Sequence, residues 1–351
     1  EQPVPFLNII MEPMAGGYGA RPHADGIDTG GLFCIPLGRV PDVEMTEFLY
    51  PVLTLWRREE PDTGGPGRHR GGVAASVAIT PHGTSVPMGL ILASAGKAVA
   101  QNAGLSGGHP GNTGLDVIAR QSRVADLLAA GRMPSELSEV SDTLEPGQNY
   151  SSTYLAPGEV FHMTWQGGGG YGDPLTRDPD AVAADVREEK VTTDGARAVY
   201  GVVVAAGPDG PTVDGGATTA ERDRQRSARQ ARSRLTGDRH GRADLGSARR
   251  LDDNLVQVTG PDGGGVVACR HCGEILGDAG PDAALTAALY EGPAAGAGPQ
   301  IIANAADYVD APVVFRQFSC PGCWTALYSG VVPASDGAPA TVPLGGGLVT
   351  I

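Results

Sequence analysis

The sequence predicts an α+β fold, with a sheet-rich body, helices at its periphery and a small C-terminal β domain organised by four cysteines. Short β-prone runs alternate with turns through the first half of the chain, and two helix-start signals follow them. Four of the five cysteines lie in the last third of the 351 residues. Glycine (53) and proline (28) are abundant while aromatic residues reach only 5%, which favours many short elements joined by turns.

The body is predicted to occupy residues 1–235. Its β-prone runs lie at residues 6–11, 52–58, 73–79, 88–94 and 160–165. Residues 114–131 space their apolar side chains along a helical stripe and end at Gly131, so we expect a helix there that packs on the sheet.

Helices should follow the sheet. Residues 178–190 begin with an Asp-Pro-Asp capping signal, and Thr193 or Asp194 is expected to cap a second short helix before a strand at 202–204. Residues 218–234 contain six arginines and almost no apolar face. We expect a solvated helix there, with a partner-binding arm as the alternative.

The remaining boundaries come from composition. Residues 236–250 are polar and patternless, which is typical of a linker. Residues 251–335 form the predicted cysteine-rich domain, and residues 336–351 are expected to be an extended tail that docks on a partner.

Charge and hydropathy narrow the class of protein. A net charge of −14 argues against broad nucleic-acid binding, because phosphate contacts need a basic surface. No apolar run approaches the roughly 20 residues that cross a bilayer, and the first residues lack the regions of a secretory signal. We therefore expect a cytoplasmic protein that contacts neither nucleic acid nor membrane. Because the chain starts without Met, we also expect it to be one piece of a larger assembly.

A glycine-rich stretch carries the pattern GxGxxG at Gly167, Gly169 and Gly172. A dinucleotide loop runs straight into a helix, whereas Asp173 and Pro174 turn the chain first, and a Walker loop would need a Gly-Lys-Ser/Thr ending. Two interpretations remain. The glycines form a crowded backbone corner with Asp173 as a cap, or they form a flexible loop at an active-site mouth whose N–H groups hold an anion.

The cysteines give a sharper signal. Cys269 with Cys272, and Cys320 with Cys323, form two CxxC pairs that together supply four thiolates for a tetrahedral Zn²⁺. Such a closed site has no open position for water, so the zinc should be structural, and His271 is surplus to it. Two disulfides or redox thiols are the alternatives. The lone Cys34 is expected to be buried packing, with a nucleophile as the alternative.

Several stretches together resemble the C-terminal half of the hydantoinase B/oxoprolinase family, which includes the large subunit of acetone carboxylase. They lie at residues 14–29, 61–72 and 167–204, and the resemblance extends over about residues 5–235. The stretches at 268–278 and 318–332 resemble the small zinc-binding subunit of acetone and acetophenone carboxylases. This pairing implies a hydantoinase B-like body joined to a zinc-ribbon-like domain.

The resemblance implies a subunit of an ATP-dependent ketone carboxylase, in which a ketone activated as its enol phosphate reacts with CO₂ or bicarbonate to give a β-keto acid. ATP and Mg²⁺ or Mn²⁺ would be bound by a hydantoinase A-like partner subunit, and another chain would supply the N-terminal half of the hydantoinase B body. Such a chain would not be active alone. The alternatives are a subunit of a hydantoinase or 5-oxoprolinase, which hydrolyses a cyclic amide, and a non-catalytic assembly subunit.

The spacing of the histidines gives no metal triad and no nucleophile–base pair. We select His23, Asp25, His69 and His162 as candidates for substrate polarisation or proton transfer, and we assign no cofactor-binding residues. His69 lies between Arg68 and Arg70 and between glycine pairs, an arrangement that suits a phosphate or carboxylate but also a turn with solvated charges.

Overall fold

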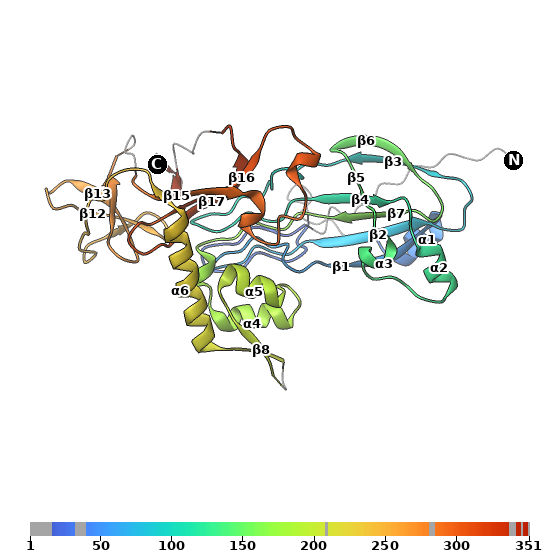
Figure 1. Ribbon diagram of the computed structural model, residues 1–351, viewed down its shortest axis with the longest axis horizontal. Helices are drawn as coiled ribbons and strands as arrows, with labels where there is room; N and C mark the ends of the chain where they lie inside the picture. Colours follow the sequence, from blue (N-terminus) through green and yellow to red (C-terminus); the bar gives the residue numbers. More distant parts are fainter. Residues whose placement is uncertain are drawn as a thin grey trace.

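The computed structural model describes residues 16–31, 40–207, 210–280, 285–336, 342–344 and 347–349. The predicted strand at 6–11 and Cys34 lie outside the described residues. Figure 1 shows an elongated molecule with a β-sheet near one end, while strands of the C-terminal third reach the other end. The long helix α6 (Gly215–Arg232) lies nearer that second end.

The sheet at one end is antiparallel and has the strand order β1-β2-β7-β4-β5. Its strands are β1 (Val52–Glu59), β2 (Ala75–Pro81), β4 (Leu115–Ala119), β5 (Glu145–Pro146) and β7 (Val160–Thr164). A separate ribbon pairs β3 (Met88–Ala93) with β6 (Tyr150–Leu155). The β-prone runs at 52–58, 73–79, 88–94 and 160–165 are thereby confirmed as strands.

Apolar side chains cover both faces of this sheet. On one face Ala78 and Val160 pack with Val124 of α2 (Val124–Ala129) and Val140 of α3 (Leu137–Val140). On the other face the cluster Val77, Ile118, Phe161 and Met163 packs against Leu92 and Leu155 of the β3–β6 ribbon. The burial of both faces explains why the central strands are almost continuously apolar.

The prediction of a helix over residues 114–131 is wrong for the first half of that stretch. Residues Leu115–Ala119 form strand β4, which pairs with β7, and only α2 near the end of the stretch is helical. The apolar spacing fits both a short strand and a helix, and pairing with a buried neighbour decides between them.

The helices after the sheet follow the prediction closely. Asp178 caps α4 (Pro179–Arg187) by accepting a hydrogen bond from the Asp180 N–H. Thr192 caps α5 (Thr193–Tyr200), one residue before the predicted caps, and Gly201 ends it with a φ of 62°. The strands β8 (Val204–Gly207) and β9 (Gly210–Val213) then form a hairpin. The short α1 (Val43–Leu49) precedes β1, and 3₁₀ turns lie at Pro174–Thr176, Ala294–Ala297 and Ala305–Asp307.

Helix α6 (Gly215–Arg232) differs from the solvated helix that the sequence predicts. Arg229 is buried and pairs with Asp173. Arg222 donates to the carbonyls of Tyr200 and Arg177, and the guanidinium of Arg232 lies 4.0 Å from the ring centroid of Tyr290. The helix therefore packs through the guanidinium groups of its arginines rather than through an apolar stripe.

The C-terminal unit, residues 234–333, contains two four-stranded antiparallel sheets. One has the order β10-β15-β16-β17, with β10 (Arg234–Leu235), β15 (Ala288–Pro293), β16 (Val313–Ser319) and β17 (Ala326–Pro333). The other has the order β11-β12-β13-β14, with β11 (Arg249–Arg250), β12 (Leu255–Thr259), β13 (Gly265–Cys269) and β14 (Ile275–Asp278). In the tail, β18 (Val342–Leu344) pairs with β19 (Gly347–Val349).

The stretch suggested as a linker, residues 236–250, is bound to these sheets. Its strand β11 pairs with β12, the adjoining β10 pairs with β15, and Arg242 forms an isolated bridge with Glu274. The domain boundaries themselves stay a prediction. Among the described residues no helix is both long and apolar enough to span a bilayer.

Candidate functional site

Between the five-stranded sheet and the C-terminal unit lie four glycine-rich segments, residues 16–19, 64–72, 104–111 and 167–172, which we call the glycine segments. Backbone hydrogen bonds connect them. Gly65 N donates to Gly168 O over 2.7 Å, Gly168 N donates to Gly72 O over 2.9 Å, and Gly170 N donates to His109 O over 2.9 Å. The polar backbone groups of these loops are thus largely paired with one another.

The glycine segments approach so closely that side chains have no room. A Cβ atom on Gly71 would lie 1.9 Å from Gly168 O, and one on Gly168 would lie 1.9 Å from Tyr18 O. In the 167–172 segment the N–H groups of Gly167, Gly168, Gly170 and Gly172 all donate to other atoms of the chain. These contacts favour the crowded-corner interpretation of the glycine run over an anion-binding loop.

The end of this corner carries a buried carboxylate, Asp173. Its Oδ1 accepts from Leu175 N over 3.0 Å, which is the predicted capping contact. Its two oxygens also accept from Arg229 of α6 over 2.9 and 2.5 Å, and Oδ2 accepts from Ala326 N of β17 over 2.8 Å. Burial opposes ionisation, but Arg229 outweighs it and lowers the pKa of Asp173.

A second group of charges lies on the glycine segments, beside α4. Arg177 forms a bidentate pair with Asp25, both contacts 2.6 Å, and its Nη2 lies 2.8 Å from Asp185. Arg70 donates to Asp185 over 3.3 Å and to Asp28 over 2.8 Å. Arg70, Arg177 and Asp185 are all less than 7% exposed.

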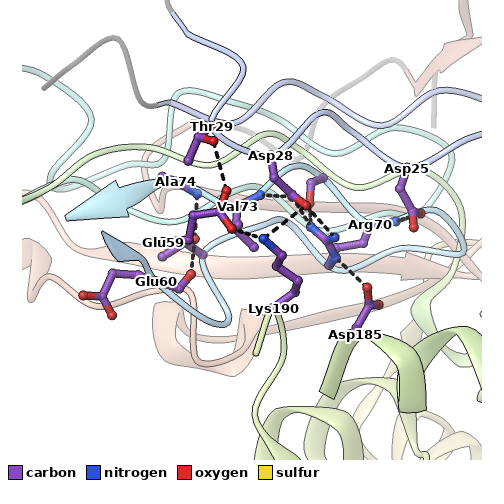
Figure 2. Close-up of polar contacts among 12 residues, drawn as sticks. Asp25, Asp28, Thr29, Glu59, Glu60, Arg70, Val73, Ala74, Asp185 and Lys190 are labelled. Atoms are coloured by element: carbon purple, nitrogen blue, oxygen red, sulfur yellow. Dashed lines mark hydrogen bonds and ion pairs between the residues drawn. The ribbon is translucent and has the colours of Figure 1, made fainter. Parts of the chain in front are cut away.

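Figure 2 shows how this group continues. Asp28 accepts from Val73 N and lies 3.7 Å from Lys190 Nζ, which in turn contacts Glu59. Burial raises the pKa of Asp28, but hydrogen bonding to Arg70 outweighs it and the net pKa is lowered. Asp28 is therefore ionised and holds the 25–29 loop against the body.

Three of the four candidate residues come together at the edge of this charged group. His69 Nδ1 lies 3.8 Å from Asp25 Oδ1, and His23 is near enough to contribute to the lowered pKa of His69. Burial, followed by the positive charge of Arg68, lowers the pKa of His69. His69 is 25% exposed, so it offers solvent a neutral imidazole beside an ionised carboxylate, which is an arrangement suited to a general base.

His162 lies elsewhere, in the middle of strand β7. It is 5% exposed, its Nε2 lies 3.0 Å from Thr164 Oγ1, and its ring centroid lies 5.7 Å from that of Trp56. Burial lowers its pKa to about 4. None of its recorded contacts involves His23, Asp25 or His69.

Sequence reasoning did not select Arg177 or Asp185, which complete the charged group. Arg70 was noted only as a neighbour of His69. The available signal was the sequence YGDPLTRDP, residues 171–179, which lies within the stretch that resembles the family. Nothing in this local pattern indicates that Arg177 contacts Asp25, which lies 152 positions earlier in the chain.

The four predicted metal ligands converge as expected. Cys269, Cys272, Cys320 and Cys323 offer sulfur atoms that all lie within 4.8 Å of one another. The Sγ atoms of Cys269 and Cys323 are 3.7 Å apart, and those of Cys272 and Cys320 are 3.6 Å apart. These separations are far longer than the roughly 2.05 Å of a disulfide, and all four cysteines are free. The cluster fits a tetrahedral thiolate metal site.

Two hairpin turns build this cluster. The first knuckle, residues 269–273, joins β13 to β14 and contains Gly273 with a φ of 76°. The second, residues 320–324, joins β16 to β17 and ends at Trp324 with a φ of 64°. The metal site therefore connects the two C-terminal sheets. His271 points its Nε2 to Asn254 Oδ1 at 2.9 Å, consistent with its being surplus as a ligand.

Comparison with known proteins identifies relatives of the body. The model of the family described as Hydantoinase B/oxoprolinase matches residues 6–174. The acetone carboxylase alpha subunit of Xanthobacter autotrophicus is 30% identical over 242 residues, covering 64% of this chain and 30% of the relative. The caprolactamase subunit beta of Pseudomonas jessenii is 31% identical over 205 residues, covering 57% of this chain and 31% of the relative.

A solved structure agrees with these matches. The nucleotide-free structure of acetone carboxylase, an enzyme of ATP-dependent acetone carboxylation, superimposes with a TM-score of 0.56 at 27% identity. It covers 63% of this chain and 31% of that chain. The chain thus spans about 30% of the length of the curated relatives it matches.

Proposed function

We propose that this chain, whose residues 6–174 match the model of the hydantoinase B/oxoprolinase family, is a subunit of a multi-subunit, ATP-dependent ketone carboxylase. In the proposed reaction the carbon of an enol phosphate attacks CO₂ derived from bicarbonate and forms a C–C bond. The phosphoryl group passes to water, and the products are a β-keto acid and phosphate. ATP, consumed in forming the enol phosphate, is handled by a partner subunit.

One observation carries the choice of reaction. The body is similar in sequence and in fold to acetone carboxylase, and the same chain continues into a four-cysteine unit of the kind that resembles the small subunit of such carboxylases. A lactam-hydrolysing enzyme, such as a hydantoinase or 5-oxoprolinase, is the alternative that the similarity to caprolactamase favours. A non-catalytic assembly subunit, whose cysteine-rich unit and arginine-rich helix only bind partners, is the alternative from another class of protein.

We assign roles to the residues that the fold brings together. His69 is proposed as the proton-transferring group, with Asp25 orienting it and His23 polarising the substrate at the exposed side of the pair. The Nδ1–Oδ1 separation of 3.8 Å is longer than a hydrogen bond, and pairs of this kind shorten when substrate is bound. His162 is buried in strand β7. For this residue we propose an indirect role, in which it acts on the site through the sheet.

The four cysteines are proposed to hold a structural Zn²⁺. Four thiolates fill the coordination shell of zinc, so no position is left for water or substrate, and the metal contributes stability rather than chemistry. Neither Mg²⁺ nor Mn²⁺ is assigned to this chain, and both are proposed to act with ATP on the partner.

The proposed partners are a hydantoinase A-like subunit and a chain that supplies the N-terminal half of the hydantoinase B body. The small molecules are a ketone and bicarbonate, and the complex is proposed to work in the cytoplasm without nucleic acid or membrane. The net charge of −14 supports the proposal that nucleic acid is not a partner, because an acidic surface repels phosphate groups.

The function is tested by purifying the chain with its natural partners and measuring substrate consumption. Ketones should be consumed only with ATP and bicarbonate, whereas hydantoins, 5-oxoproline and caprolactam should be untouched. Lactam turnover without a bicarbonate requirement would replace the carboxylase by the hydrolase. A complex that needs this chain to assemble but keeps full activity when the chain carries His69→Ala would support the assembly role.

The residue roles are tested in the same complex. His69→Ala is expected to lower kcat by about 10²- to 10⁴-fold, the usual contribution of a general acid or base, with unchanged assembly by size exclusion. His82→Ala, at an exposed histidine outside the charged group, is the matched control and should keep full activity. Equal activity of both variants would remove His69 from the mechanism.

A further inference from the structure

Asn254 lies where the metal unit meets the glycine segments. The residue is 3% exposed and stands directly before β12. Its Nδ2 donates to Ser106 O over 2.5 Å and to Ala326 O over 3.0 Å. Its Oδ1 accepts from His271 Nε2 over 2.9 Å. One buried amide side chain therefore contacts the body, the strand after the second knuckle, and the first knuckle.

The knuckle end of this contact depends on the metal ligands. His271 lies between Cys269 and Cys272, so its backbone is held in place once both thiolates bind the same ion. Without an ion, nothing cross-links the two CxxC pairs, whose sulfur atoms are 3.7 Å apart between Cys269 and Cys323 and 3.6 Å apart between Cys272 and Cys320. The position of the Asn254 amide is thereby tied to metal binding.

The body end of the contact is a tight turn. Ser106 has a φ of 49° and Gly107 a φ of 88°, and a Cβ atom on Gly107 would lie 2.0 Å from Ala326 O. A left-handed serine is strained and persists only when its surroundings hold it. The bond from Asn254 to the Ser106 carbonyl is one of the contacts that hold this turn against β17.

The turn is connected to His69 by backbone hydrogen bonds. Leu105 N donates to Gly170 O and Gly172 N donates to Leu105 O, both over 2.9 Å. Tyr171 and His69 then exchange two backbone hydrogen bonds of 2.9 Å. A second connection runs from Asp253, the neighbour of Asn254, to Arg68, the neighbour of His69.

We propose that Asn254 is a positioning residue that couples metal binding by the four cysteines to the backbone geometry of His69, through the turn at Ser106. The inference rests on the proposed metal site. It means that metal binding in the C-terminal unit also affects the structure of the body. In this proposal Asn254 holds the His69–Asp25 pair in place only when the four cysteines of the C-terminal unit bind their metal.

The test is hydrogen exchange by mass spectrometry on the full chain, with zinc content measured on the same samples. Removal of zinc by a chelator should speed exchange at least about tenfold in peptides covering residues 66–72 and 104–108, because their backbone donors lose a fixed neighbour. Asn254→Ala should retain its zinc and show the same faster exchange in those peptides, while strands β13 and β17 stay protected.

Two further variants complete the design. Arg249→Ala removes an exposed side chain that donates hydrogen bonds to half-buried Gln257 across β11 and β12, and this variant should exchange like wild type. His271→Ala keeps all four thiols and should give the Asn254→Ala pattern at smaller amplitude, which covers the case in which Asn254→Ala does not fold.

The outcomes separate the two proposals. A wild-type chain that binds no zinc and still has protected 66–72 and 104–108 peptides overturns the metal site and the coupling together. A wild-type chain that loses its zinc to the chelator and keeps those peptides protected overturns the coupling alone. A zinc-loaded wild-type chain whose Asn254→Ala and His271→Ala variants exchange like wild type overturns the coupling alone.

Discussion

At the scale of single residues, Asp173 is the point at which three parts of the chain meet. Its carboxylate is 2% exposed and joins the glycine segments, α6 and the first residue of β17. A buried carboxylate is tolerated only when its oxygens are matched, and here Arg229 and two backbone N–H groups match them.

Replacing this carboxylate by an amide is expected to be costly. Asp173→Asn leaves the buried Arg229 without a counter-charge and should lower the free energy of unfolding by about 3–5 kcal/mol. Urea denaturation followed by circular dichroism measures the change. Asp223→Asn is the control, because Asp223 is 69% exposed and pairs only with Arg226 in the same helix, so the effect should stay below about 0.5 kcal/mol. Similar losses in both variants would contradict the role of Asp173.

Two buried histidines should govern stability in mildly acidic solution. Burial lowers the pKa of His109 and of His162 to about 4, against 6.5 in an unfolded chain. Above pH 6.5 both states are neutral and the two histidines add no pH dependence. As pH falls from 6.5 towards 4 the unfolded chain binds protons that the folded chain excludes, so stability falls by up to about 1.4 kcal/mol per pH unit for each histidine.

The measurement is the urea midpoint at several pH values between 7 and 4. His162→Leu should flatten the decline by about one histidine's share, because the protonated unfolded form is no longer available. His82→Gln, at an exposed position, should leave the decline unchanged. A His162→Leu variant with the wild-type slope would show that His162 takes up its proton in the folded state.

The sequence could identify some of these residues as candidates, but it could not predict which of them lie together in the fold. His23, Asp25 and His69 stood out as polar groups near glycines, and the fold does gather them. Arg177 and Asp185 are buried ion-pair partners whose importance depends on contacts across more than a hundred residues, and no local pattern carries that information. The cysteines are the exception, because CxxC spacing alone fixes the geometry of two ligands.

At the scale of elements, most strands were predictable from the sequence. Whether a short apolar stretch forms a strand or a helix was not. Residues 115–119 have apolar spacing compatible with both structures, and only the neighbour β7 makes them a strand. Helix α6 shows the opposite case. Its helical nature was predictable, yet its packing surface includes arginines that the sequence suggested would face water.

The glycine segments provide a sharp test of packing at this scale. Gly71→Ala places a methyl group against the carbonyl of Gly168, which is backbone and cannot turn aside, so we expect a loss of at least about 3 kcal/mol or failure to fold. Gly89→Ala is the matched control, because no atom lies within 4 Å of its Cβ position and β3 leaves that side open. Its stability should change by less than about 1 kcal/mol. Thermal unfolding of both variants makes the comparison, and equal melting temperatures would contradict the close packing.

At the scale of the whole molecule, the body and the C-terminal unit share contacts that are too buried for two freely moving domains. Arg229, Asn254 and Arg68 each reach from one to the other. The polar stretch between them looked like a linker in the sequence, because its short strands β10 and β11 are recognisable only beside β15 and β12.

Metal content is the property of the whole chain that is simplest to check. Elemental analysis should find about one zinc per chain, and Cys320→Ser should lose it and melt at a lower temperature because the two C-terminal sheets are no longer cross-linked. Cys34→Ser, at the cysteine without a CxxC partner, is the control and should keep its zinc. A well-folded chain that is free of metal would rule out the proposed centre.

The crowding of the glycine segments also limits how this protein can change. A core of side chains tolerates a larger residue when a neighbour becomes smaller, so one substitution can compensate another. Between Gly71 and Gly168 both neighbours are already the smallest residue, and the atoms in contact belong to the main chain. No second substitution can make room there, so a variant at this corner is rescued only by reverting it.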